Sequence, residues 1–209
     1  MVAEVLSGMV RGIQGELITV QADISDGLPV FGMTGHLSSE VKEAKERVRT
    51  ALKNTGYHLP PRRVSVNLAP ADVRKSGTCY DLAIAVGILT AMGLISRESV
   101  RGILFLGELS LDGMLSPLTG VLSILKAALG AGCHTCVLPL SNVREASLLP
   151  EIKVLGFADL EEVVHFLTGQ REEGKMRRKD LSDVPPECVS EQLWYSDRDK
   201  DRENGRQYP

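Results

Sequence analysis

The sequence predicts an α+β domain of two layers, in which a mixed sheet carries helices on one side. Two observations lead to this fold class. Short segments that alternate apolar and polar residues around glycine dominate residues 5–35 and indicate antiparallel strands. From residue 133 onward, strand-like and helix-like segments follow one another in turn, which favours parallel pairing through β-α-β units.

The first strands are predicted over residues 5–14, 15–25 and 28–35, and a helix follows over 37–56. The apolar residues of this helix recur at steps of three and four and share one face: Leu37, Val41, Ala44, Val48, Ala51 and Leu52. Ser38 or Ser39 can cap its start, and Gly56 stands where a helix end favours positive φ.

A strand over residues 62–70 is indicated by strict alternation, and a helix over 80–93 is apolar on nearly every side. Such a helix is expected to be buried. Thr78 and Asp81 have the spacing of a capping box at its start, so we interpret both as capping residues.

The segment 103–118 is predicted to contain two strands joined around Asp112 and Gly113, because Asp-Gly between apolar runs is a strong hairpin signal. The remaining elements are a helix over 121–132, a buried strand over 133–139, a short helix over 141–149, a strand over 152–157 and a closing helix over 159–169.

The composition changes near Gly169. We interpret residues 1–169 as one folded domain and 170–209 as a charged linker or disordered tail. The tail carries nine basic and ten acidic residues in 40 positions. A segment so rich in charge cannot bury enough apolar surface to offset the chain entropy lost on folding.

No apolar run approaches the roughly 18 residues that a bilayer requires, and the start lacks the pattern of a signal peptide. Four cysteines in 209 residues are too few for a disulfide scaffold. We therefore expect a cytoplasmic protein without membrane contact. The net charge of −3 excludes a bulk polycation but allows a local basic patch.

Neither phosphate-binding glycine motif, G-x-x-x-x-G-K-[ST] or G-x-G-x-x-G after a strand, occurs, so these residues are not expected to hydrolyse ATP or to bind a cofactor. A metal site is not expected either. Cys133 and Cys136 supply two ligands where structural zinc needs about four. On a strand they would also point to opposite faces, so we interpret them as small buried hydrophobes.

Two long stretches, residues 64–93 and 105–139, resemble the Lon-protease-type domain, whose fold is similar to the second domain of ribosomal small-subunit protein five. That domain also caps bacterial RadA. The opening D-I-S-D-G-L-P-V-F, residues 23–31, resembles the ComM/YifB proteins rather than Lon itself. Residues 2–168 are thereby identified as similar to the N-terminal domain of the ComM/YifB family, the magnesium-chelatase-subunit-I-like AAA+ ATPases.

In active Lon proteases a serine at the start of the buried helix attacks the peptide and a lysine on the following helix accepts its proton. By the resemblance these positions fall at Cys79 and Leu122. A thiol needs a base or a lowered pKa to attack, and leucine provides neither. Lys126 lies one turn further and would require a shifted geometry. The resemblance thus implies a non-catalytic domain, with a residual peptidase that uses Cys79 as the alternative.

Residues 40–75 hold a local excess of cations: Lys42, Lys45, Arg47, Arg49, Lys53, Arg62, Arg63, Arg74 and Lys75, against Glu40, Glu43, Glu46 and Asp72. Lys42, Lys45, Arg49 and Lys53 share one helix face, away from the apolar stripe. Such a row can neutralise phosphates without reading bases. The alternative is an ordinary solvated face.

The candidate nucleic-acid-binding residues are Lys42, Lys45, Arg49, Lys53, Arg62, Arg63, Arg74 and Lys75. Lys75 and Asp81 could instead line a ligand or subunit contact. The resemblance implies ring assembly and DNA contact, and DNA branch migration in transformation for the whole ATPase. ATP and Mg²⁺ would belong to an AAA+ module, which we expect to lie outside these 209 residues. Expected partners are DNA, further copies of the chain or that module, and a purely structural oligomerisation domain is a further alternative.

Overall fold

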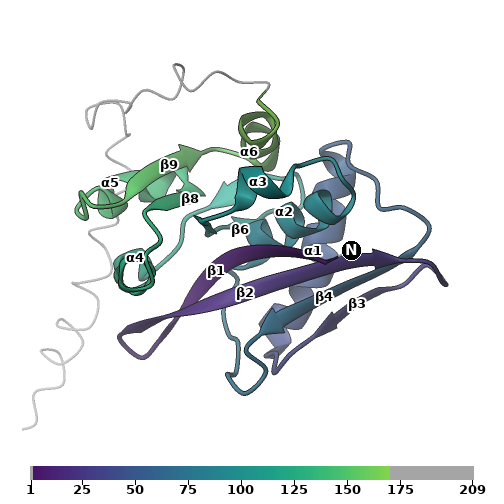
Figure 1. Ribbon diagram of the computed structural model, residues 1–209, viewed down its shortest axis with the longest axis horizontal. Coiled ribbons are helices and arrows are strands. Elements are labelled where there is room, and N and C mark those ends of the chain that lie inside the picture. Colours follow the sequence, from purple (N-terminus) through teal and green to yellow (C-terminus); the bar gives the residue numbers. More distant parts are fainter. Residues whose placement is uncertain (1, 170–209) are drawn as a thin grey trace, which may run out of the picture. The chain divides into compact units, whose positions relative to one another are not determined.

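The computed structural model describes residues 2–169. Its main sheet has seven strands in the order β3-β4-β2-β1-β5-β8-β9 (Figure 1). These strands are β1 (Ala3–Arg11), β2 (Gln14–Ser25), β3 (Phe31–Thr34), β4 (Arg63–Ala69), β5 (Ile103–Phe105), β8 (Thr135–Pro139) and β9 (Lys153–Phe157). A two-stranded ribbon contains β6 (Glu108–Leu109) and β7 (Leu115–Ser116). The helices are α1 (Ser39–Asn54), α2 (Asp81–Ala91), α3 (Arg97–Val100), α4 (Val121–Gly130), α5 (Val143–Ala146) and α6 (Leu160–Leu167), with a 3₁₀ turn, η1, at Leu140–Asn142.

The direction of the strands confirms a mixed sheet. β2 pairs antiparallel with β1 and with β4, whereas β3–β4, β1–β5, β5–β8 and β8–β9 are parallel pairs. Among the described strands of this sheet, β2 alone runs against the others. The predicted parallel pairing after residue 133 is confirmed by β8 and β9. The strand predicted over 28–35 pairs parallel with β4 through α1, so β-α-β connections begin earlier than expected.

The predicted ends of the first helix are confirmed. The Ser38 hydroxyl accepts a hydrogen bond from the amide of Val41, which satisfies one of the free donors at the start of α1. At the other end Gly56 adopts φ 87°, and the amide of Tyr57 reaches back to the carbonyl of Leu52.

Each face of the sheet carries an apolar core, and the two cores are separate. One core joins α1, α2 and α6 to strand residues such as Val5 and Val20. The other joins α4 and α5 to the opposite face, where Leu6 and Leu17 point. The predicted arrangement, with helices on one side of the sheet, therefore accounts for α1, α2 and α6 but not for α4 and α5, which lie on the opposite face. The reason lies in strands such as β8, which is buried at every position after Thr135, so that Val137 enters one core and Leu138 the other.

The other sequence expectations are met with two changes. α2 is buried on all sides, as predicted. The predicted hairpin around Asp112 and Gly113 is confirmed for β6 and β7, while β5 belongs to the main sheet. Cys133 and Cys136 are buried, but they pack in the same core and do not face opposite ways, because β8 begins only at Thr135.

None of the helices within residues 2–169 is long and apolar enough to cross a bilayer. The predicted tail, 170–209, lies outside the described residues.

Candidate functional site

The candidate site lies where β1 and β5 diverge. These parallel strands share one registered pair, Leu6 with Leu104. Beyond it, the segment that leads into α2 occupies the gap. The amide of Gly107 donates to the carbonyl of Cys79, and the amide of Leu82 donates to the carbonyl of Gly107, both at 3.0 Å. The carboxyl ends of parallel strands are the edge at which ligands commonly bind in α/β sheets.

Cys79 lies on the β1 side of this gap. Its Sγ donates a hydrogen bond to the carbonyl oxygen of Gly8, at 3.0 Å. Burial raises the pKa of the Cys79 thiol to about 12, and the carboxylates of Asp81 and Glu108 act in the same direction. The charged groups that act on this thiol within the described chain are therefore anionic, the reverse of what activates a nucleophilic cysteine.

Leu122 belongs to α4, which packs on the other face of β1. A side chain at Gly8 would meet Ile124 of α4, so Cys79 and α4 approach the same strand residue from different directions. Leu122 is half-buried and Lys126, the next lysine along the helix, is exposed. The helix that carries Leu122 thus packs on the strand to which Cys79 bonds, and no ammonium group of residues 2–169 is among the charges that act on the thiol.

Arg47 and Asp81 form a buried ion pair beside this gap. Arg47 Nε and Nη2 donate to Asp81 Oδ2 and Oδ1 at 2.8 and 3.1 Å, and the amide of Leu109 donates to Oδ2 at 3.3 Å. Burial raises the pKa of Asp81 to about 6, although Arg47 opposes the shift. Sequence reasoning missed this pair. The available signal was a carboxylate in the first turn of a helix that is otherwise apolar.

The capping role predicted for Thr78 and Asp81 is wrong. The helix begins after Tyr80, and no side chain caps it. The carboxylate of Asp81 is taken up by Arg47 and Leu109, and the hydroxyl of Thr78 donates to the carboxylate of Glu108.

A second acidic group ties the same loop to α1. Glu40 Oε2 accepts a hydrogen bond from the amide of Gly77 at 3.1 Å, and Arg47 Nη2 donates to the carbonyl of Glu40 at 3.5 Å. The pKa of Arg47 is raised, first through its hydrogen bond to Asp81 and further by the charges of Glu108 and Glu43. The flank of α1 that faces α2 is therefore acidic around one arginine.

Lys75 does not belong to an exposed basic surface, contrary to the sequence expectation. Its side chain is fully buried and Nζ donates to the carbonyl of Pro70. The backbone of Lys75 also bonds to His36 and Ser38, at 2.8 and 3.0 Å. Desolvation lowers the pKa of Lys75. Because Asp81 is fully buried too, neither residue lines an exposed ligand or subunit contact in this structure.

The opposite flank of α1 carries the predicted row of cations. Lys42, Arg49 and Lys53 are exposed and Lys45 is half-buried. Within the described residues, none of the four is paired with a carboxylate. Because β3 and β4 are parallel, α1 must return between them, so its end lies near the start of β4.

The other candidate cations also lie on the surface. Arg62 and Arg63 are exposed at the start of β4, and Arg62 Nε lies 3.5 Å from Asp26 Oδ1. Arg74 is exposed. It precedes Lys75, which forms an isolated β-bridge with Leu37 close to the start of α1. The cations other than Lys75 therefore reach the surface, at both ends of α1 and along it.

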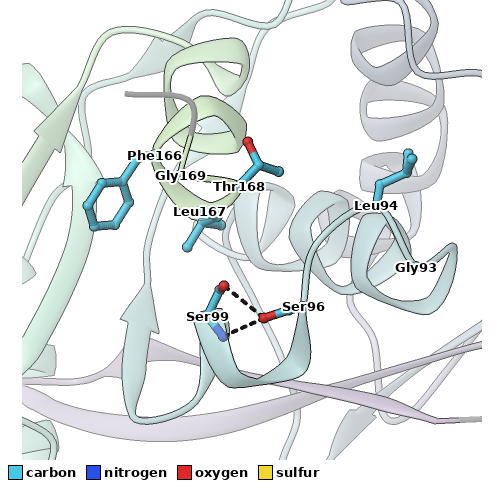
Figure 2. A pocket seen from close by; sticks show the side chains of 8 residues that line it. All are labelled: Gly93, Leu94, Ser96, Ser99, Phe166, Leu167, Thr168 and Gly169. Atoms are coloured by element: carbon cyan, nitrogen blue, oxygen red, sulfur yellow. Dashed lines mark hydrogen bonds between the residues drawn. The ribbon is translucent and has the colours of Figure 1, made fainter. Parts of the chain in front are cut away.

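An open depression of about 640 Å³ lies elsewhere, between the α2–α3 turn and the end of α6 (Figure 2). Figure 2 shows the hydroxyls of Ser96 and Ser99 hydrogen-bonded to each other, at 2.9 Å. The lining includes Leu94, Phe166 and Thr168 but no ionisable side chain. No cluster of three or more His, Cys, Asp or Glu residues within 2–169 could hold a metal ion.

Comparison with known proteins decides the family. The family model described as subunit ChlI of Mg-chelatase matches residues 20–142, more than half of the chain. Competence protein ComM of Haemophilus influenzae is 38% identical over 168 residues, which cover 80% of this chain and 33% of that protein. YifB of Escherichia coli is 36% identical over 159 residues, 76% of this chain and 31% of that protein. The chain belongs to the ComM/YifB family of magnesium-chelatase-like proteins.

Within this family the chain corresponds to an N-terminal domain. An uncharacterised protein of Mycobacterium tuberculosis is 37% identical over 87% of this chain and 36% of its own length. The chain thus spans about a third of the length of these curated relatives. Lon protease of Geobacter metallireducens is more distant, 26% identical over 69% of this chain and 19% of that protein. The ComM/YifB match agrees with the resemblance seen in the sequence.

Proposed function

We propose that this ComM/YifB-family domain is a non-catalytic module that contacts the DNA backbone through α1 and contributes to ring assembly. The observation that carries the proposal is the row Lys42, Lys45, Arg49 and Lys53, which is not neutralised within the described residues. Cations spaced along one helix suit a line of phosphates. The whole family protein would then process DNA with ATP, through an AAA+ module and Mg²⁺ that these residues do not supply.

The segregation of charge on α1 supports this role. Glu40 and Arg47 face the α2 side, where their partners are internal to the domain. The basic flank has no such internal partner, so it remains available to an external polyanion. The competing peptidase function has no comparable support, because the pKa of Cys79 is raised to about 12 by burial.

Salt dependence of DNA binding tests the proposal. Binding of a short duplex should weaken steeply with salt, with the log–log slope reduced by about 0.9 for each phosphate contact removed. The double change Lys45→Gln with Arg49→Gln should reduce both affinity and slope. Lys126→Gln with Arg144→Gln removes the same charge from exposed positions of α4 and α5 and should leave both unchanged. Equal effects of the two pairs, or binding that does not depend on salt, would remove DNA contact from the proposal.

Ring assembly is tested separately by light scattering of the 209-residue chain across a concentration series. Growth beyond a monomer without DNA would support a role in assembly. A monomer at high concentration would count against it. Assembly without any DNA binding would instead favour a purely structural oligomerisation domain.

A further inference from the structure

One half of the sheet leaves a polar face uncovered. On the α4 side, helix packing reaches Gly8 and Gly15 near the hairpin of β1 and β2. Further along, a row of directly opposed residues crosses four strands: Glu4 on β1, Gln21 on β2, Asn67 on β4 and Thr34 on β3. These residues are exposed or half-buried. The row is a solvent-facing strip at right angles to the strands.

Hydrogen bonds run along the whole row. Thr34 Oγ1 donates to Asn67 Oδ1 at 3.1 Å, and Asn67 Nδ2 donates to Gln21 Oε1 at 3.0 Å. Gln21 Nε2 then donates to Glu4 Oε1 at 2.8 Å. The carboxylate of Glu4 is thereby held toward β2, which fixes the charge at the end of the row.

An open depression of about 430 Å³ adjoins that end of the row. Its accessible apolar part comes from Val2 and Leu6, because Val5 and Val100 are buried, and its polar part from Glu4, Thr19, Arg97 and Arg101. Arg97 and Arg101 are four residues apart and both are exposed. The depression therefore combines an apolar floor of Val2 and Leu6 with two exposed arginine side chains.

The two guanidinium groups have no anionic partner in the described chain. No carboxylate within residues 2–169 lies within ion-pair distance of either. Glu4, the acidic residue of the lining, accepts a hydrogen bond from Gln21. Arginine presents a planar fork of donors that matches a carboxylate in two-point contact. Two guanidinium groups without an anionic partner in residues 2–169, beside an apolar floor, match an anionic ligand that also carries an aliphatic group.

We propose that this depression is a docking site for an acidic peptide segment of a partner protein, with one aliphatic side chain seated between Arg97 and Arg101. The lining has no aromatic ring on which a base could stack, so the chemistry favours a peptide over single-stranded nucleic acid. Arginine at the rim of an apolar contact is also typical of protein interfaces. This site is separate from α1 and does not depend on the proposed contact with DNA.

Fluorescence anisotropy with defined probes tests the proposal on the full 209-residue chain. The probes are a labelled Glu-Asp-Leu-Glu-Asp peptide, the same peptide with Ser in place of Leu, and a mixed-sequence 12-nucleotide strand. The Leu peptide should bind at least tenfold more tightly than the Ser peptide. Arg97→Gln with Arg101→Gln should weaken the Leu peptide by at least tenfold, and Lys126→Gln with Arg144→Gln should leave it unchanged.

Two further variants separate charge from shape. Glu4→Gln removes the nearby negative charge and should tighten binding of the Leu peptide. Thr19→Tyr fills the depression without changing charge, on a strand that favours tyrosine, and should weaken that binding. Circular dichroism confirms that each variant is folded.

Three results would overturn the proposal. One is no measurable binding of the Leu peptide at millimolar concentration. Another is equal affinity for the Leu and Ser peptides. The third is a preference for the nucleotide strand that the Arg97 and Arg101 changes abolish, which would assign the site to nucleic acid. A loss of duplex binding in the variant with Lys45 and Arg49 changed would not alter binding of the Leu peptide at Arg97 and Arg101. Either proposal can therefore fail without the other.

Discussion

Arg47 of α1 and Asp81 of α2 are joined by two hydrogen bonds, with the Asp81 side chain fully buried and the Arg47 side chain 20% exposed. The pair fixes the helix that carries the basic row against the helix that begins at the candidate site. One flank of α1 has its charged groups bonded inside the domain, whereas the other flank, with the basic row, is exposed to a partner.

Removal of Arg47 should be costly. Arg47→Ala leaves the carboxylate of Asp81 buried without a cation, so the free energy of unfolding should fall by about 3 to 5 kcal/mol. Arg49→Ala, two residues along on the exposed flank, should change it by less than about 0.5 kcal/mol. Urea denaturation measures both. Similar losses for the two variants would show that the ion pair does not hold α1 to α2.

Asp81 should give the protein an unusual dependence of stability on pH. Burial raises its pKa from 3.8 to about 6, so between these values the folded state binds the proton more tightly than the unfolded state does. The contribution of this group is therefore fully present below about pH 4 and is lost as pH rises through 6. Unfolding free energies at pH 4.5 and 7.5 should show this decline in the wild type relative to Asp81→Asn. Parallel pH profiles would contradict the raised pKa.

Cys79 should be a poor nucleophile. With a pKa of about 12, fewer than about one thiol in ten thousand is ionised at neutral pH, so alkylation at this position should be slow. Cys79→Ser should not cleave casein, because Leu122 supplies no base. Cys79→Ser with Leu122→Lys is the double change to assay for gained activity. Cleavage by the single variant would show that the two positions are misassigned.

Substitution of Lys75 should not change the affinity of the domain for DNA. Because its side chain is fully buried, Lys75→Met should leave affinity for a duplex and its salt slope unchanged. Arg74→Gln, the exposed neighbour, is the matched change and should lower affinity modestly if the loop contacts DNA. A loss of affinity in folded Lys75→Met but not in Arg74→Gln would contradict the burial of the lysine.

Gly15 should tolerate no side chain. A Cβ there would lie 2.2 Å from the carbonyl oxygen of Ser123, a backbone atom that cannot move without displacing α4. Gly15→Ala should therefore lower the melting temperature by several degrees, as expected for about 1 to 3 kcal/mol of overpacking. Gly130→Ala is the control, since a Cβ there meets nothing within 4 Å, and it should be neutral or slightly stabilising.

Local patterns in the sequence predicted the elements well. The Ser38 cap, Gly56 and the Asp112–Gly113 turn each depend on a few neighbouring residues, and all three are confirmed. Strand partners were harder. Alternation marks β3 as a strand but does not indicate that it pairs parallel with β4.

The candidate site was predicted less completely, because its chemistry depends on contacts between distant residues. Arg47 and Asp81 are 34 positions apart, and their attraction overrides the local capping geometry that the spacing of Thr78 and Asp81 suggested. Lys75 is indistinguishable from Arg74 by charge, yet backbone pairing with His36 buries it. The row on α1 was predicted as an exposed face because it follows from helical periodicity alone.

The single registered pair between Leu6 and Leu104 also determines what holds the two halves of the sheet together. Within residues 2–169, the half with β1 and β2 shares with the β5-β8-β9 half only this backbone pair and the Ser7 hydroxyl, which donates to the carbonyl of Phe105 at 2.9 Å. The two apolar cores also cross this boundary: Val5 and Val137 lie in one of them, and Leu6 and Leu104 in the other. At this boundary the sheet is therefore joined more through its side chains than through its backbone.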